Sequence, residues 1–439
     1  MNTAVLIDIS QLRIGMYIQL DLGWMHHPFP VSSFRVGSAE QIATLRELGL
    51  SQIKYIPKKS DPEFRDGIPA SAISAAPSPQ DAISEANAGA VTAQEKPQPD
   101  NAALRRRALL AAQNVSLEAC DRRFRLATRQ YVALEKLVGD QPQVAYAEGE
   151  ALVSECVADL LENGDSAIRL LSEGVGEPGA LHQINVMVLS LLLGKALGMK
   201  SEELHDLGAA ALLHDIGKVG MPLQLAYASP TMTLAERSRY ESHVAASVAL
   251  ATRMGWSKQV LATIAQHHEM VDGSGFPLRR GAKELDRASQ VVALVNHYDR
   301  MCSPAGGGGS TPHETLSIIF AQHKARFDSV VLGAFIRMMG VYPPGSVVQL
   351  VNDRYAIVVS VNSSRPLRPR VIVHDSRVPK DEAPILDLET VPELGIRRSL
   401  KPSQLPRDAL DYLSPRKRIC YFFERAVGTE TVEAEVRPS

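Results

Sequence analysis

Apolar side chains recur at the spacing i, i+3, i+4 through most of residues 145–340. This spacing puts them on one face of successive α-helices, which must then pack against one another to bury that face. The glycine run at 304–312 interrupts the pattern, and we interpret it as a flexible loop. The segment 184–198 is the most apolar, but it contains Lys195 and is short for a bilayer span. The pattern therefore predicts a helical bundle with a buried central helix and no membrane span.

The segments on either side of the bundle have other patterns. Residues 1–60 contain short alternating runs around a helical stretch, which predicts a small α+β domain with a regulatory role. Residues 61–102 are rich in Ala, Pro, Ser and Gln, so they are predicted to be a flexible linker. Residues 103–140 have helical spacing and a basic polar face, which fits either a connecting helix that transmits a signal or a solvated helix face. Residues 341–439 change to a period of two, which predicts a small β-rich extension.

Composition limits the classes of function. A chain of 439 residues is longer than one core usually serves, so two or three domains are expected. The formal net charge of −2 gives no global attraction to a nucleic-acid polymer or to an anionic membrane. The four cysteines are far apart and form no CxxC pair, which favours a reducing compartment. No basic region precedes an apolar run at the N-terminus, so we expect no signal peptide and a cytoplasmic protein.

Histidines are the most informative residues of the predicted bundle. Most of them stand at the edge of an apolar helical stretch, and Asp215 directly follows one of them. A single such histidine is more often a satisfied core residue than a ligand. Several on different helices would each need a separate partner, whereas one metal centre satisfies them together. Imidazole suits iron, manganese, zinc or nickel, and a carboxylate shifts the preference toward harder ions. The histidines are His182, His214, His243, His267, His268 and His297.

These residues lie in motifs that resemble a known family. The segments HQINV, HDIGKVGMP, ESH and HHEMVDGSGFP follow one another at the order and spacing of the HD-GYP family. This family is the cyclic di-GMP phosphodiesterase branch of the HD superfamily. Its GYP signature reads Gly275-Phe276-Pro277 here. Residues 1–60 resemble the domain of unknown function that often precedes HD-GYP domains in bacterial proteins. The fold implied is mainly α, an HD-type bundle flanked by a small α+β domain and a small β unit.

The resemblance also implies the site residues. Asp215 falls on the position of a ligand that bridges two ions, and Lys218 on that of a lysine that approaches the scissile phosphate. Arg279 follows the signature loop and either adds positive charge for the substrate or belongs to a solvated basic turn. The implied metal ligands are His182, His214, Asp215, His243, His267 and His268, with Asn296 at a seventh position. The implied substrate-binding residues are Lys218, Asp272, Gly273, Gly275, Phe276 and Pro277, together with Arg279.

Three features depart from the family pattern. Asn296 stands where the family has a ligating aspartate, and an amide oxygen can ligate a metal but brings no charge. Asp299 lies one helical turn further on, so it either points to the same side as Asn296 or corresponds to the family's second aspartate, which we interpret as structural. An arginine-containing segment that grips the substrate phosphate is replaced by CSPAGGGGSTPHE. Pro178 stands where some members have a glutamate that binds a third ion, which argues for two ions here.

Two functions from different classes follow. The first is a phosphodiesterase that hydrolyses cyclic di-GMP to linear pGpG, with further hydrolysis to GMP left open. Two divalent ions, iron or manganese, about 3.5–4 Å apart would hold a bridging hydroxide in such an enzyme. The second is a catalytically degenerate domain that binds the nucleotide or a protein and transmits a signal. Survival of six of the seven expected ligands and of Lys218 favours the enzyme. The resemblance also suggests diguanylate cyclases as partners and leaves a homodimer open.

Overall fold

The computed structural model describes residues 5–20, 33–47, 50, 52–61, 64, 101–162, 166–227, 231–304, 307–362, 368–391 and 394–425. The chain divides into two compact units, Met1–Arg105 and Arg106–Ser439. Most of the predicted linker, 61–102, lies outside the described residues, as does 426–439. In the part of the chain that is described, we find no helix long and apolar enough to cross a membrane.

The N-terminal unit is a small α+β domain, as predicted. Its antiparallel sheet has the strand order β1-β4-β2-β3. One face of the sheet buries Leu12, Met16, Ile18 and Tyr55 together with Leu45 of the helix. The elements are β1 (Val5–Asp8), β2 (Tyr17–Gln19), β3 (Ser33–Arg35), α1 (Ala39–Glu47) and β4 (Gln52–Tyr55).

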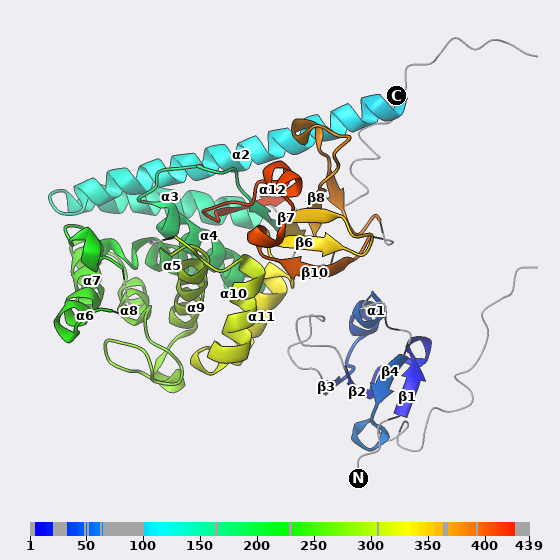
Figure 1. Cartoon of the computed structure of the whole chain (residues 1–439). Coiled ribbons are helices and arrows are strands. Elements are labelled where there is room, and N and C mark those ends of the chain that lie inside the picture. Colours follow the sequence, from blue (N-terminus) through cyan, green and yellow to red (C-terminus); the bar gives the residue numbers. More distant parts are fainter. Residues whose placement is uncertain are drawn as a thin grey trace, which may run out of the picture. The chain divides into compact units, whose positions relative to one another are not determined.

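A long helix, α2 (Asn101–Leu137), begins the second unit and agrees closely with the helix expected over 103–140. It turns back into α3 (Pro142–Glu162) and runs along both the helices and the C-terminal strands (Figure 1). Phe124 and Tyr131 anchor it in the core. Its other end meets the C-terminal sheet, where the Gln113 side-chain amide exchanges two 3.1 Å hydrogen bonds with the backbone of Ile385.

The helical bundle is built around α4 (Leu181–Ala196), which is buried on nearly every side from Ile184 to Gly194. This explains its apolar sequence: the helix has no solvent face over that length. Lys195 lies past the buried stretch, and its ammonium donates to the Leu160 carbonyl at 2.7 Å. The helices around α4 are α5 (Ser201–Leu213), α6 (Leu234–Glu241), α7 (His243–Met254), α8 (Lys258–Gln266), α9 (Arg287–Cys302), α10 (Pro312–Ile318) and α11 (Ser329–Met339).

The C-terminal sheet draws one strand from within the helical segment. Its main path is β10-β6-β7-β5-β11, with β8 beside β7 and β9 beside β8, all antiparallel. Strand β5 (Ser166–Leu170) precedes α4 yet lies between two strands from the end of the chain. The boundary predicted at residue 340 therefore divides a single sheet. The other elements are β6 (Val347–Leu350), β7 (Tyr355–Asn362), β8 (Arg370–Val373), β9 (Ile385–Asp387), β10 (Ile396–Leu400), α12 (Arg407–Leu413) and β11 (Tyr421–Arg425).

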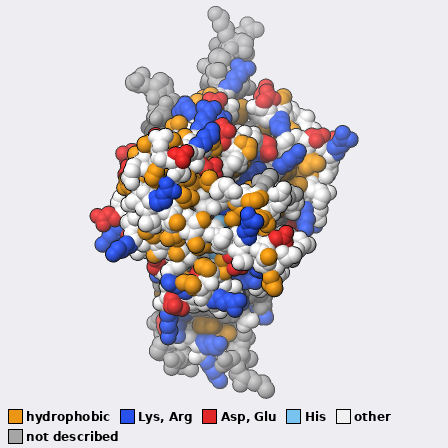
Figure 2. Space-filling model, turned by 90° about the vertical axis from the view of Figure 1, so that its left-hand side faces the viewer, with side chains coloured by type: hydrophobic (Ala, Val, Ile, Leu, Met, Phe, Trp, Pro, Cys, Tyr) orange, Lys and Arg blue, Asp and Glu red, His pale blue; other side chains and the backbone are white. Residues whose placement is uncertain are grey.

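The surface carries no single dominant charge on the face drawn in Figure 2. Lysine and arginine side chains are interspersed there with aspartate and glutamate, and apolar side chains lie between them. This distribution agrees with the nearly balanced composition of the chain, whose formal net charge is −2.

Candidate metal centre

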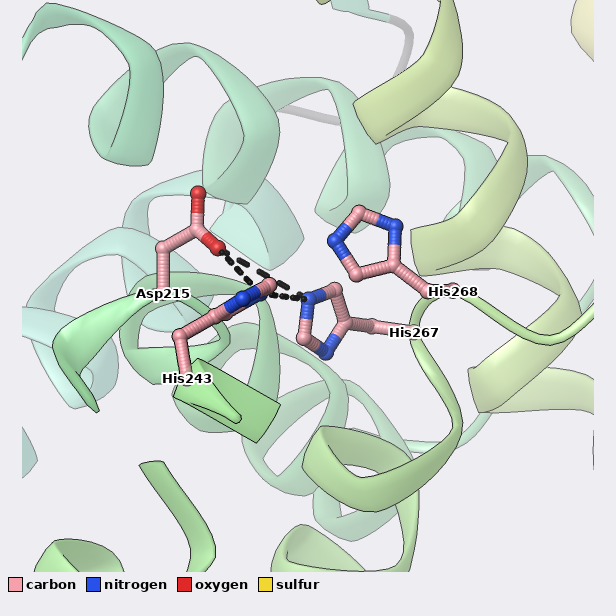
Figure 3. A group of neighbouring side chains, drawn as sticks. All are labelled: Asp215, His243, His267 and His268. Carbon is pink, nitrogen blue, oxygen red and sulfur yellow. Dashed lines mark hydrogen bonds and ion pairs between the residues drawn. The ribbon is translucent and has the colours of Figure 1, made fainter. Parts of the chain in front are cut away.

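Helix ends bring the predicted ligands together. His182 lies in the first turn of α4, His214 directly follows α5, His243 begins α7, and His267 directly follows α8. Helix ends are suitable places for ligands because a side chain there can leave the helix surface and reach a neighbouring element. Figure 3 shows Asp215, His243, His267 and His268 turned toward one another. The structure thus assembles residues that are up to 86 positions apart in the sequence, from His182 to His268.

The first of two ligand groups consists of Asp215, His243, His267 and His268, all buried. One potential ligand atom from each lies within 4.8 Å of those of the other three. Asp215 Oδ1 is 3.2 Å from His243 Nε2 and 3.7 Å from His267 Nε2. The two imidazole Nε2 atoms are 3.3 Å apart. These separations are those expected between ligand atoms that each lie about 2.0–2.2 Å from a common ion. We call these residues the four-ligand group.

The second group consists of His182, His214 and the same Asp215. The Nε2 atoms of His182 and His214 are 3.3 Å apart. The distance to Asp215 Oδ2 is 3.7 Å from His182 Nε2 and 3.4 Å from His214 Nε2. We call these residues the three-ligand group. The two carboxylate oxygens of Asp215 therefore face different groups, which is the arrangement that a bridging ligand requires.

Hydrogen bonds at Nδ1 determine which ring nitrogen carries the proton in four of the histidines. Three of the rings use Nδ1 to donate to the carbonyl three residues earlier in the chain, and the fourth donates to a carboxylate. Because Nδ1 carries the proton, the Nε2 lone pair of each ring points into the centre and is free to bind a metal. The pairs are His214 with Ala211 at 2.7 Å, His243 with Tyr240 at 2.5 Å, His267 with Ile264 at 2.7 Å and His182 with Asp299 at 2.6 Å.

Burial favours the neutral form of three of the histidines in the centre. It lowers the pKa of His182 to about 4 and that of His267 to about 3, and it holds the pKa of His268 well below its usual value. Burial alone would raise the pKa of Asp215, but the charges of Lys218 and Arg300 outweigh it and keep that pKa well below the usual range. At neutral pH His182, His267 and His268 are therefore neutral and Asp215 is ionised, which are the forms that bind metals.

An unpaired acceptor shows that the four-ligand group fits a cation. Asp215 Oδ1 is buried and has no hydrogen-bond donor in the part of the chain that the structure describes. The nearest polar atoms to Oδ1 are Nε2 of His243 and Nε2 of His267. Both nitrogens present lone pairs, so three acceptor atoms face one another without a donor between them. A buried acceptor without a partner is costly. A divalent ion of the kind that imidazole and carboxylate prefer would satisfy all of them at once.

The signature loop packs directly against this group. Phe276 stacks on the His268 ring, with centroids 4.3 Å apart and planes 25° from parallel. Gly275 is required there because a Cβ atom would lie 2.4 Å from the His268 carbonyl oxygen. Asp272 stabilises the turn by accepting from the Ser274 backbone at 3.0 Å and from its hydroxyl at 2.6 Å. Gly273 has a φ of +74°, Pro277 follows Phe276 in the loop, and Arg279 is exposed with a φ of +56°.

Glu269 holds the loop in place and was given no role in the sequence analysis. Its buried carboxylate accepts from the backbone N–H of Leu278 at 2.6 Å and from that of Arg280 at 2.9 Å. These two bonds tie the far end of the signature loop to the residue directly after His268. The signal was present in the sequence, since a glutamate inside an apolar, histidine-containing segment needs a buried partner.

Helix α9 contributes the remaining predicted position. Asn296 is buried, and its Oδ1 accepts a 2.7 Å hydrogen bond from Nε of Arg300. Arg300 in turn places Nη2 2.5 Å from Asp215 Oδ2, and Lys218 places Nζ 2.8 Å from the same oxygen. His297 points to a different neighbour, with Nε2 3.0 Å from Nδ1 of His323, and it belongs to neither ligand group.

Asp299 supports the three-ligand group from behind. Besides binding His182, its carboxylate accepts from Asn185 Nδ2 at 2.5 Å and lies 3.3 Å from Nη2 of Arg418. Asn185 also bonds the C-terminal segment, donating to the Ile419 carbonyl at 3.0 Å and accepting from the Tyr421 N–H at 2.8 Å. The segment before β11 is thus part of the support of the centre.

Asp299→Asn is expected to weaken metal binding by the three-ligand group about 10–100-fold and to leave binding by the four-ligand group unchanged, because the replacement no longer fixes the Nδ1 proton of His182 with a charged acceptor. Competition with a chelator of known affinity measures the effect. Asp408→Asn, at an exposed position of α12, serves as the control and should leave the affinity unchanged. Equal affinities in the two variants would mean that Asp299 does not orient a ligand.

Comparisons with known proteins match two family models to the chain. A family model described as an HD domain matches residues 155–331. A second, described as a domain of unknown function, DUF3391, matches residues 5–148. Within the HD match lie the paired histidines and the glycine signature loop. Residues 155–331 therefore form an HD domain. The DUF3391 match runs past the predicted N-terminal domain of 1–60 and ends within α3.

Named relatives share much of the chain. A cyclic di-GMP phosphodiesterase of Pseudomonas aeruginosa is 27% identical over 394 residues, which cover 87% of this chain and 88% of the relative. A cyclic di-GMP phosphodiesterase of Borreliella burgdorferi is 22% identical over 51% of this chain and 60% of the relative. Among solved structures, an HDG"Y"P protein of Bdellovibrio bacteriovorus matches with a TM-score of 0.42 and 16% identity, over 76% of this chain and 98% of that chain.

Proposed function

We propose that this protein is a metal-dependent phosphodiesterase that hydrolyses cyclic di-GMP to linear pGpG, with further hydrolysis to GMP as a second step. The observation that carries the proposal is the buried Asp215, whose unpaired Oδ1 faces imidazole lone pairs held in the metal-binding tautomer. The names of the two relatives support the choice of substrate. The Asp215, His243, His267 and His268 side chains would hold an ion, of which iron and manganese are our candidates.

Different residues of this chain would bind the metal, attract the phosphate and contact the nucleotide. A divalent ion in the four-ligand group would supply Lewis-acid charge and lower the pKa of bound water. Lys218 presents an ammonium that is only 12% exposed, so its charge is poorly screened and can attract a phosphoryl oxygen. Phe276 forms the wall beside His268, and we propose that Pro277, which follows it, contacts the substrate. We propose that the turn of Asp272, Gly273 and Gly275, with the exposed Arg279, contacts the nucleotide.

A receptor function is the second candidate, and one observation favours it. Asn296 brings no charge to the centre, and its oxygen already accepts from Arg300. Such a centre could bind the nucleotide and transmit its presence without turning it over. Partnership with diguanylate cyclases and a homodimer, both suggested by the resemblance, stay predictions.

Chromatography of reactions with cyclic di-GMP separates the two functions. Full-length protein loaded anaerobically with Fe²⁺ or Mn²⁺ should convert the cyclic nucleotide to linear pGpG. Folded, metal-loaded protein that binds the nucleotide with no product would support the receptor instead. A cyclic dinucleotide in which one guanine is replaced by adenine, assayed in parallel, tests whether the base is recognised.

An alkaline limb in the pH profile of kcat/KM is expected from Lys218. Burial, together with the charge of Arg300, lowers the pKa of Lys218 to about 8, although Asp215 partly opposes the shift. As pH rises through this value, the ammonium loses its proton and its attraction for phosphate. The rate should then fall about tenfold per pH unit well above the pKa. Lys218→Arg keeps its charge at all these pH values and should lack this limb. If wild type and Lys218→Arg show the same alkaline decrease in kcat/KM, another group causes that decrease.

A further inference from the structure

The two oxygens of Asp215 have opposite surroundings. Oδ1, in the four-ligand group, meets only acceptors among the described residues. Oδ2, in the three-ligand group, already lies 2.8 Å from the Lys218 ammonium and 2.5 Å from the Arg300 guanidinium. One side of the carboxylate therefore lacks a cation, while the other has two.

Arg300 is held in this position from both ends of its guanidinium. Nε donates to Asn296 Oδ1 at 2.7 Å, and Nη2 reaches Asp215 Oδ2. Asn296 and Arg300 are four residues apart on α9, so they lie on the same face of the helix. The side chain is 25% exposed and stays charged, since an arginine does not lose its proton in this pH range. The position where the resemblance expects a carboxylate thus holds a neutral amide that positions a fixed positive charge.

These contacts do not fit a second tightly bound ion. An ion held by His182 and His214 would have Asp215 Oδ2 as the one carboxylate oxygen of its group, and it would share that oxygen with two cations. Like charges at such short range repel strongly in a buried site. The amide of Asn296 adds no negative charge to offset the repulsion.

We infer that the centre binds one divalent ion tightly, in the four-ligand group, and that the Arg300 guanidinium supplies the second positive charge beside Asp215 in place of a second ion. A second ion would bind the three-ligand group at least about 100-fold more weakly. The inference replaces the two-ion expectation drawn from the resemblance. It rests on the proposed function only for the identity of the anion that the guanidinium would face.

Metal stoichiometry tests the inference without any activity. Full-length protein is saturated with Mn²⁺, desalted, and analysed by mass spectrometry for metal and by electron paramagnetic resonance. Wild type should retain about one Mn²⁺ per chain with the six-line signal of an isolated ion. The double variant Asn296→Asp/Arg300→Gln should retain about two, with the exchange-coupled signal of ions about 4 Å apart. Arg287→Gln, at an exposed position of the same helix, should match wild type.

Two tightly held, coupled ions in wild type would overturn the inference, and so would a wild type that retains none. A folded double variant that stays at one ion would also overturn it. If the double variant does not fold, the wild-type spectrum still decides. Failure of the proposed function gives a different result. One retained ion with no hydrolysis of cyclic di-GMP would contradict the proposed function but not this inference. Two retained ions with normal hydrolysis would contradict this inference but not the proposed function.

Discussion

Asp215→Asn is expected to abolish tight metal binding and to reduce turnover of cyclic di-GMP by at least about 10³-fold. The carboxylate is the one charged ligand shared by both groups, and its oxygens lie within 3.7 Å of four imidazole nitrogens. An amide of the same shape removes the negative charge and points an N–H at one of these lone-pair-rich sites. Loss of several kcal/mol of charge stabilisation corresponds to about that factor in rate. Metal content after desalting and the initial rate measure the two effects.

Asp206→Asn is the matched control for this variant. Asp206 lies on α5, the helix that ends two residues before Asp215, and accepts a hydrogen bond from Ser257 at 3.0 Å on the protein surface. Its replacement should leave metal content and rate within about twofold of wild type, because surface substitutions rarely have large effects. Asp215→Asn protein that keeps both its metal and its rate would show that the centre assembled by these helices is not the reactive one.

Gly217→Ala is expected to have the largest effect on folding. A Cβ atom at this position would lie 2.3 Å from the His243 carbonyl oxygen and 2.3 Å from the Ser247 backbone nitrogen, so backbone would have to move. The Gly217 N–H also donates to the Ser247 hydroxyl at 2.9 Å. Overpacking of this kind costs about 1–3 kcal/mol and more where backbone is displaced. We expect a loss of about 3 kcal/mol in the free energy of unfolding, together with loss of metal, since α7 carries His243.

Gly139→Ala provides the comparison for Gly217→Ala. Gly139 lies in the turn after α2, and a Cβ atom there would meet no heavy atom within 4 Å. Its unfolding free energy should stay within about 0.5 kcal/mol of wild type in urea denaturation. If both variants unfold at the same urea concentration, the close approach between Gly217 and α7 does not contribute to the free energy of unfolding.

The histidine centre was predictable because its ligands lie in short motifs at helix ends. HDIGK and HHE place their residues within one turn of each other, and the structure keeps those local relations. The helical bundle and the small N-terminal sheet followed from periodicity for the same reason, since apolar spacing reports a local property. The contact that occupies Asn296 could not be derived from the sequence of α9 alone. Its partner Arg300 is held by Asp215, which lies in a distant segment of the chain.

Long-range pairing is what the sequence did not reveal. Strand β5 has five residues and lies between helical segments, so its period of two is too short to identify. Its partners are β7 and β11, about 190 and 255 residues later in the chain. The same pairing brings Arg418 to Asp299 and the Tyr421 backbone to Asn185. No local pattern connects these residues, so the role of the C-terminal segment behind the centre emerges only from the fold.

Turnover of cyclic di-GMP, followed while Mn²⁺ is returned to chelator-treated full-length protein, tests metal-dependent hydrolysis most directly. We predict no product in the metal-free protein. Linear pGpG should then form at a rate that rises with bound metal and levels off near one ion per chain, when the four-ligand group is filled. Hydrolysis at an unchanged rate without metal, or no hydrolysis by folded protein that has bound its ion, would contradict the proposed function.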